Sequence, residues 1–378
     1  MQFFHRLSYK SKPLRVCFTT IIPYFCILFM SAKFIIILIF VFVVVASLIL
    51  DLGLFSKNKH ESLTIRQSIQ RTGLWFGLGL LSVLAVYLFH YKIYNISDVQ
   101  GLQEYAVKYH SNFEINSNFE ESLHRFRVAT TTAYFSGYIL EYALSVDNLF
   151  VMLLIFSTFK VSEFNEKRIL LWGVLGAMIL RLIFVVLGSA AINQFHWILY
   201  AFGVLLIYSG GKLLFEKEED EFDPNGHFMI RLGKKFLSVE NQPENPNAFF
   251  TRQNNKFQVT PLFLVLLVIE FTDVLFAVDS VPAVFGVTTD PYLVFFSNIF
   301  AILGLRSLFF LLGHGMDKFY ALKYGLSIIL IYIGGKMLME DYFHDIGFTH
   351  IHNLIVIIGI LAMSIFYSLV FPSKKEIN

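Results

Sequence analysis

Long apolar runs dominate the sequence, and short polar segments separate them. A helix of about 20 apolar residues crosses about 30 Å of hydrocarbon. These runs lack the polar face that the surface helices of a soluble protein show. The sequence therefore predicts an all-α polytopic membrane protein with about nine transmembrane helices, at residues 33–54, 72–92, 130–157, 169–190, 196–214, 260–287, 292–313, 321–339 and 351–371.

Two connections between these runs are long and polar. Residues 93–128 carry several acidic side chains, and residues 215–258 are rich in charge, Asn and Pro, with a charged run at Glu216–Asp223. This composition is typical of solvated loops, and we expect both connections to be such loops.

Two parts of the chain, residues 129–214 and 259–340, hold three apolar runs each and share their landmarks in one order. The first landmark is an acid that is followed, six positions later, by a second acid and a small polar residue: Glu141, Asp147 and Asn148, and then Asp273, Asp279 and Ser280. A Leu-Arg pair (Arg181, Arg306) and a Gly-Gly-Lys triplet (Lys212, Lys336) follow in each. An odd number of spans reverses the second unit, so we expect two inverted three-helix repeats.

Basic residues indicate the orientation of the remaining segments. With the N-terminus outside, residues 30–128 hold two helices and an outside acidic loop, 215–258 form a cytoplasmic charged loop, and 341–378 hold the last helix and a cytoplasmic tail. Lys and Arg then gather on the cytoplasmic side. Residues 1–29 are basic and conflict with this orientation, so we expect them to be an extension that precedes a start at Met30.

Acidic residues inside the predicted spans are the candidate chemistry: Asp51, Glu141, Asp147, Glu270, Asp273 and Asp279. An ionised carboxylate at the bilayer centre is unfavourable by at least about 2.5 kcal/mol. These side chains must therefore meet cations, protons or Arg partners inside the bundle. Arg181 and Arg306 can neutralise two of the six, which leaves the others for a ligand.

The donor set is rich in oxygen, because the Asn148 amide and the Ser280 hydroxyl accompany the carboxylates. Oxygen donors suit Mg²⁺, Ca²⁺ and Mn²⁺, and they do not distinguish among these ions. Pro282 follows Asp279 closely, and a proline inside a helix frees a backbone carbonyl. We therefore expect the span 260–287 to be broken near this site.

Composition narrows the class of protein. The chain is 56% hydrophobic and 15% charged, whereas soluble domains carry about 25% charged residues. A net charge of +2 gives no indication of a nucleic-acid partner. Only Cys17 and Cys26 are cysteines, and no catalytic fingerprint appears, so we expect neither an enzyme nor a cofactor. Intramembrane aspartic proteases also pair aspartates in two spans, and we rank that alternative lower.

Several segments resemble the signature of the TerC family of integral membrane proteins, from about Met30 to the end of the last span. The most specific are Ser145–Val151 and Phe276–Pro282, and Leu50–Phe55, Phe195–Tyr200, Thr260–Leu264 and Leu303–Arg306 agree with them. The resemblance implies a bacterial inner-membrane protein of a family that is named for tellurite resistance. Its members are similar to manganese exporters and are grouped with LysE-like transporters.

By match to these motifs, the resemblance implies metal binding by Glu141, Asp147, Asp273 and Asp279, with Asn148 and Ser280 beside them and Asp51 as the acid of the first span. An acidic site repels the tellurite anion, so we expect any tellurite resistance to be indirect. The main hypothesis is a divalent cation transporter that exports manganese through the bilayer. The alternative is a membrane factor that scaffolds exported proteins or loads metal onto them without net transport. A homo-oligomer or a membrane protein partner is compatible with either hypothesis.

Overall fold

Helices make up most of the chain in a computed structural model. It describes residues 32–51, 64–111, 113–195, 197–215, 228–240, 245, 247–253, 256–313, 321–339, 342–343 and 346–371. The expected extension, residues 1–29, and the charged run Glu216–Asp223 lie outside this part. The helices of the bundle are α2 (Ala32–Asp51), α3 (Ile65–Ile93), α5 (Phe119–Thr158), α6 (Glu163–Gln194), α7 (Trp197–Phe215), α9 (Pro261–Phe285), α10 (Pro291–Leu303), α11 (Leu305–Leu312), α12 (Leu322–Leu338) and α14 (His350–Val370).

An all-α polytopic membrane protein is confirmed in its broad form. Within the described residues, six helices are long and apolar enough to cross a membrane, and a seventh span is formed if α10 and α11 are counted as one. The predicted spans 33–54 and 321–339 are helices too, as α2 and α12, but they are not among these six. Nine spans therefore stay a prediction.

Capping residues explain where several helices begin. Thr64 and Gln67 form a capping box at the start of α3, and Asn118 accepts from two backbone N–H groups of α5. Thr260 and Asp290 cap α9 and α10, and a proline occupies the first position of each of these helices. Proline suits this position because its missing N–H would have no partner there.

The expected break at Pro282 is wrong. Helix α9 continues through Pro282 and ends at Phe285, so only one short turn follows the proline. The bend lies instead at Gly304, where α10 and α11 meet at 44°. A Cβ on Gly304 would lie 3.1 Å from the Cβ of Trp75 on α3, so a glycine lets the bent span approach that helix closely.

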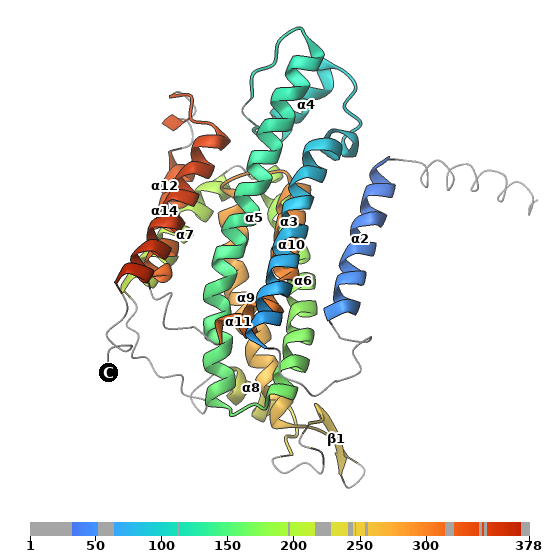
Figure 1. Ribbon diagram of the computed structural model, residues 1–378, viewed down its shortest axis with the longest axis vertical. Helices are drawn as coiled ribbons and strands as arrows, with labels where there is room; N and C mark the ends of the chain where they lie inside the picture. The colour runs from blue at the N-terminus through green and yellow to red at the C-terminus, as the bar shows by residue number, and fades with distance from the viewer. Residues whose placement is uncertain are drawn as a thin grey trace, which may run out of the picture.

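Both long connections hold more structure than a solvated loop. Residues 93–128 contain α4 (Val99–Lys108) and the first turns of α5, and they enclose a small apolar core with Leu102 and Phe126. Residues 215–258 contain α8 (Phe228–Phe236) and an antiparallel hairpin of β1 (Phe250–Gln253) and β2 (Lys256–Val259). Figure 1 shows these additions at opposite ends of the bundle, which we call the cap end (α4) and the hairpin end (α8 and β1).

The helices of residues 129–214 pack against those of residues 259–340. Helix α5 lies against α10, α6 against α9, and α7 against α12. Glycines bring α7 and α12 together, because a Cβ on Gly203 would lie 2.9 Å from the carbonyl oxygen of Gly334. The Ser327 hydroxyl donates to the carbonyl oxygen of Gly210 at 2.5 Å. Small residues at such a contact permit close helix packing inside a membrane.

Candidate functional site

Glu141 and Arg181 form an ion pair in the middle of the bundle. Glu141 on α5 is 0% exposed and Arg181 on α6 is 2% exposed. The Ser145 hydroxyl donates to Glu141 at 3.3 Å, and Arg181 also donates to the Asn298 side chain of α10 at 2.8 Å. One of the two expected Arg partners is therefore in place, and it joins α5, α6 and α10.

Asp273 on α9 lies in the same buried region. The Asn148 amide donates to Asp273 Oδ1 at 2.5 Å, and Arg181 is close enough to Asp273 to interact with it electrostatically. Asp273 Oδ2, Glu141 Oε2 and Asn148 Oδ1 are buried without a hydrogen-bond partner. Buried oxygens in folded proteins are nearly always paired, so these three need an explanation.

Glu270 lies one helical turn before Asp273 on α9, at the edge of this buried region. It is half-buried and interacts electrostatically with Asp273. Its carboxylate lies where a Cβ on Gly176 of α6 would be, so the absence of a side chain at Gly176 makes room for it. We call Glu141, Asn148, Arg181, Glu270, Asp273 and Asn298 the acidic cluster.

Asp279 has other neighbours than the acidic cluster. The Ser209 hydroxyl of α7 donates to Asp279 Oδ1 at 2.7 Å, and Lys212 of the same helix interacts with Asp279 electrostatically. Asp147 is half-buried on α5, next to Asn148. Ser280 is 3% exposed, and its hydroxyl has no hydrogen-bond partner. Asp51 ends helix α2, but its side chain lies outside the described part of the structure.

The acidic cluster has suitable donor atoms for a cation, but too few of its carboxylates lie close together to form a complete site. Within the described residues, no three His, Cys, Asp or Glu side chains lie close enough together to hold a metal ion. The oxygens without partners are nevertheless the hard donors that divalent ions such as Mg²⁺ and Mn²⁺ prefer. A cation would therefore bind through one or two carboxylates with amide or hydroxyl oxygens, or after a movement that brings the carboxylates together.

Two polar contributors were missed in the sequence. Asn298 is a polar amide inside the predicted span 292–313, and its position there was the available signal. Ser209 directly precedes the Gly-Gly-Lys triplet of the first unit.

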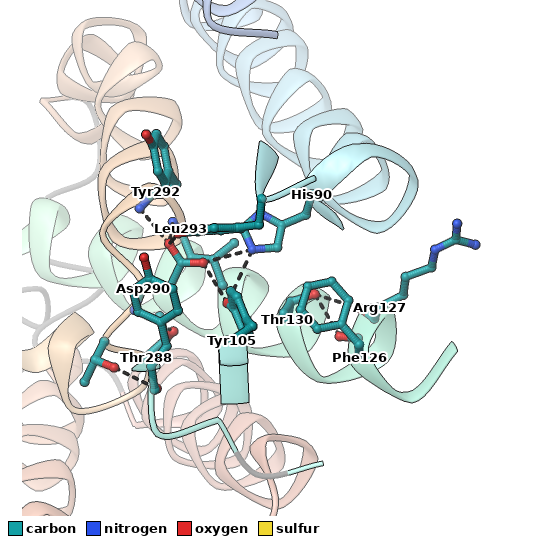
Figure 2. Close-up of polar contacts among 12 residues, drawn as sticks. His90, Tyr105, Phe126, Arg127, Thr130, Thr288, Asp290, Tyr292 and Leu293 are labelled. Carbon is teal, nitrogen blue, oxygen red and sulfur yellow. Dashed lines mark hydrogen bonds and ion pairs between the residues drawn. The ribbon is translucent and has the colours of Figure 1, made fainter. Parts of the chain in front are cut away.

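A second buried polar group was also missed, and it lies at the cap end (Figure 2). Asp290, which is 0% exposed, accepts from the Tyr94 hydroxyl at 2.8 Å and from the Tyr105 hydroxyl at 2.7 Å. His90 Nε2 lies 2.9 Å from Oδ2, the oxygen that also accepts from Tyr105, and the Tyr292 backbone N–H donates to Oδ1 at 2.8 Å. Burial by itself would raise the pKa of Asp290, but His90 and the hydrogen bonds hold that pKa below its usual range.

The fold and this site define a polytopic helical membrane protein with an acidic, arginine-containing cluster inside its bundle. The chain belongs to the TerC family, because the family model described as "Integral membrane protein TerC family" matches residues 126–376. This confirms the family that the motifs indicated.

Bacterial relatives share most of the chain. "Putative membrane-bound redox modulator Alx" of Salmonella typhi is 38% identical over 328 residues, which is 86% of this chain and 91% of the relative. The protein of the same name from Escherichia coli (strain K12) is 38% identical over 327 residues, 86% and 91% of the two chains. "Uncharacterized membrane protein STKORF319" of Myxococcus xanthus is 36% identical over 335 residues, 88% and 91% of the two chains. No solved structure matches this chain.

Proposed function

We propose that this protein transports divalent metal cations across the bacterial inner membrane and that its cargo is Mn²⁺, moving outward. The observation that carries the proposal is the pair of buried carboxylates, Glu141 and Asp273, which share one guanidinium and leave one oxygen each without a hydrogen bond. One arginine balances one of the two charges. A cation or a proton must compensate the other, because a lone charge inside a membrane bundle is strongly unfavourable.

Protons offer a means of release and of coupling. A carboxylate that accepts a proton loses its charge and much of its affinity for a cation, since metal ligands bind in their deprotonated form. Exchange of protons for metal at Asp273 would then drive transport. The half-buried Glu270 and Asp279 lie along α9 on either side of Asp273 and would extend the path of the ion.

The packing of the two units supports inverted repeats. The first helix of the first unit, α5, packs on α10, the second helix of the other unit, and α6 packs on α9 in the same crossed way. The third helices, α7 and α12, pack on each other. A two-fold relation between the units would produce this pattern. Transporters with inverted repeats hold their site at the interface of the repeats and expose it alternately to each side, and the acidic cluster lies at this interface.

Localisation and phenotype follow from the same proposal. The distribution of Lys and Arg among the loops supports an N-terminus outside and a C-terminus in the cytoplasm. The name of the Alx relatives refers to redox modulation. We relate a redox effect, and any tellurite resistance, to manganese balance, because an acidic cluster repels an oxyanion and the only cysteines are Cys17 and Cys26.

Metal content of cells that overproduce the protein tests this function. Asp273→Asn removes the charge that Arg181 does not balance and keeps the size of the side chain. We expect cells with this variant to retain manganese, whereas cells with the parent protein lose it. Glu120→Gln is the matched control, because Glu120 is exposed on the same helix as Glu141. Equal manganese content with Asp273→Asn and Glu120→Gln would refute the assignment of the site.

One observation favours a second function, a membrane factor that docks exported or partner proteins. The side chains of Phe250 and Phe257 stack with ring centroids 5.2 Å apart at the hairpin end and are 47% and 69% exposed. Exposed aromatic groups of this kind are common in interaction surfaces. Replacing both with Ser should abolish co-purification of a partner under this alternative and should leave metal transport unchanged under the first.

A further inference from the structure

Asp290 joins two parts of the protein that are far apart in the sequence. It lies in the connection between α9 and α10, whereas its partners His90 and Tyr94 lie at the end of α3 and Tyr105 lies on α4. In Figure 2 the His90 ring and the Tyr105 hydroxyl point toward the Asp290 carboxylate from two different helices. A buried carboxylate with this many donors is held firmly, because charge-assisted hydrogen bonds are the strong ones.

Two further contacts reinforce this junction. Thr289 donates through its hydroxyl to the backbone carbonyl of Tyr109 at 2.7 Å, so adjacent residues of the connection are both tied to the cap. The His90 ring stacks on Phe126 of α5, with ring centroids 5.8 Å apart. Helix α4 and the end of α3, which together we call the cap, are therefore held both to the start of α10 and to the outer part of α5.

Helix α10 connects this junction to the acidic cluster. Asp290 caps α10, and Asn298, which accepts from Arg181, lies about two turns further along the same helix. Ser297 lies between them in the chain, is 0% exposed and faces Gly137 of α5. A movement of the cap end of α10 would therefore displace Asn298 and change the surroundings of the Glu141–Arg181 pair.

The opposite end of the bundle has a different construction. The corresponding connection of the first unit joins α5 to α6 at the hairpin end, and its capping residue, Ser162, is exposed and makes no side-chain cap. A cavity of about 20 Å³ adjoins Asp273 on this side and is lined by Leu149, Leu170 and Arg306, among others. The acidic cluster thus adjoins a small space toward the hairpin end, while α10 is tied down at the cap end.

We propose that Asp290 with His90, Tyr94 and Tyr105 is a latch that keeps the acidic cluster closed toward the cap end, and that its release opens this side. The proposal rests on the proposed function, because it assigns the latch to the transport cycle of the acidic cluster. These four are positioning residues: they act on the site through α10, and none of them contacts the acidic cluster.

Thiol labelling measures the closure directly. In a chain with Cys17→Ser, Cys26→Ser and Ser297→Cys, the rate at which a membrane-impermeant maleimide reacts at position 297 reports access from the cap end. Asp290→Asn should raise this rate at least tenfold. Asparagine is as good a capping residue as aspartate, so α10 keeps its start while the charge of the latch is lost. Asp98→Asn is the matched control, since Asp98 is exposed at the same end and caps α4, where its side chain accepts from the Gly101 backbone N–H.

A second variant distinguishes release of the latch from general unfolding. Tyr94→Phe with Tyr105→Phe removes two hydroxyl donors and keeps the Asp290 charge and both rings, and it should raise the labelling rate at least threefold. Hydrogen exchange in the α5–α6 connection at the hairpin end should stay at the parent rate in both variants. Labelling rates within twofold of the parent in both variants would overturn the latch, and so would exchange that rises equally at both ends in the tyrosine double variant.

Failure of the latch and failure of the proposed function give different results, because the labelling needs no metal. One outcome is that Asp290→Asn raises the labelling rate at position 297 while the parent protein moves no Mn²⁺ in vesicles. In that case the latch is supported, and its role in a transport cycle is refuted. If the parent moves Mn²⁺ and neither variant changes the labelling rate, transport is supported and the latch is refuted.

Discussion

Replacing Arg181 with methionine tests the buried ion pair that organises the acidic cluster. The change removes the guanidinium and leaves the Glu141 carboxylate buried without its partner, since Glu141 is 0% exposed. Breaking a buried pair from one side destabilises proteins by about 3–5 kcal/mol, because an uncompensated charge remains. Arg181→Met should therefore lower the free energy of unfolding by about 3–5 kcal/mol. Adding Glu141→Gln should restore at least about 1.5 kcal/mol of this loss, as expected for two groups in direct contact.

The assay is denaturation in mixed micelles by titration with a charged detergent, followed by circular dichroism. Arg125→Met is the matched control, because Arg125 pairs with Glu114 and Glu121 on the surface and its side chain is 35% exposed. Surface pairs contribute about 0–1 kcal/mol. The reasoning is refuted if Arg181→Met is within about 1 kcal/mol of Arg125→Met, or if the effects of Arg181→Met and Glu141→Gln are simply additive.

Three further predictions concern the packing of α7 on α12, the position of Glu270 in the acidic cluster, and the pH dependence of the stability that Asp290 contributes. Gly334→Ala should lower the free energy of unfolding by about 1–3 kcal/mol, because its Cβ would lie 2.5 Å from a carbonyl oxygen of α7, whereas Gly211→Ala, with nothing within 4 Å, should be tolerated in the same titration. Gly176→Ala should displace the Glu270 carboxylate and lower Mn²⁺ flux about tenfold with unchanged expression, and an unchanged flux would remove Glu270 from the ion path. The pKa of Asp290 is lowered in the folded protein, so the stabilisation from its own ionisation is lost as the pH falls from about 4 through the folded pKa. The difference in melting temperature between the parent and Asp290→Asn should therefore shrink below a pH of about 4, and a difference that stays unchanged there would contradict this reasoning.

Hydropathy was sufficient to predict most of the helices. The last predicted span, 351–371, is helix α14 (His350–Val370) within one residue at each end. Recurring landmarks also identified Glu141 and Asp273 as a related pair, and both are buried in the acidic cluster. These predictions succeeded because apolar length and charge inside an apolar run are local properties of the sequence.

The cap and the latch depend on distant contacts, and for that reason the sequence did not reveal them. Asp290 and Tyr94 are hydrogen-bonded across 196 positions. Helix α4 has ten residues and is polar on one side, so its composition resembles that of a loop. The break expected at Pro282 was wrong for a related reason: a proline close to the end of a helix disrupts little, and the contact of Gly304 with Trp75 places the bend elsewhere.

The flux of Mn²⁺ into vesicles that contain only the purified protein tests the central claim most directly. The parent protein and the exposed control Glu120→Gln should move Mn²⁺ at the same rate, well above vesicles without protein, and Asp273→Asn should reduce the rate to that of empty vesicles. The account is contradicted if the parent moves no more Mn²⁺ than empty vesicles, or if Asp273→Asn moves as much as the parent.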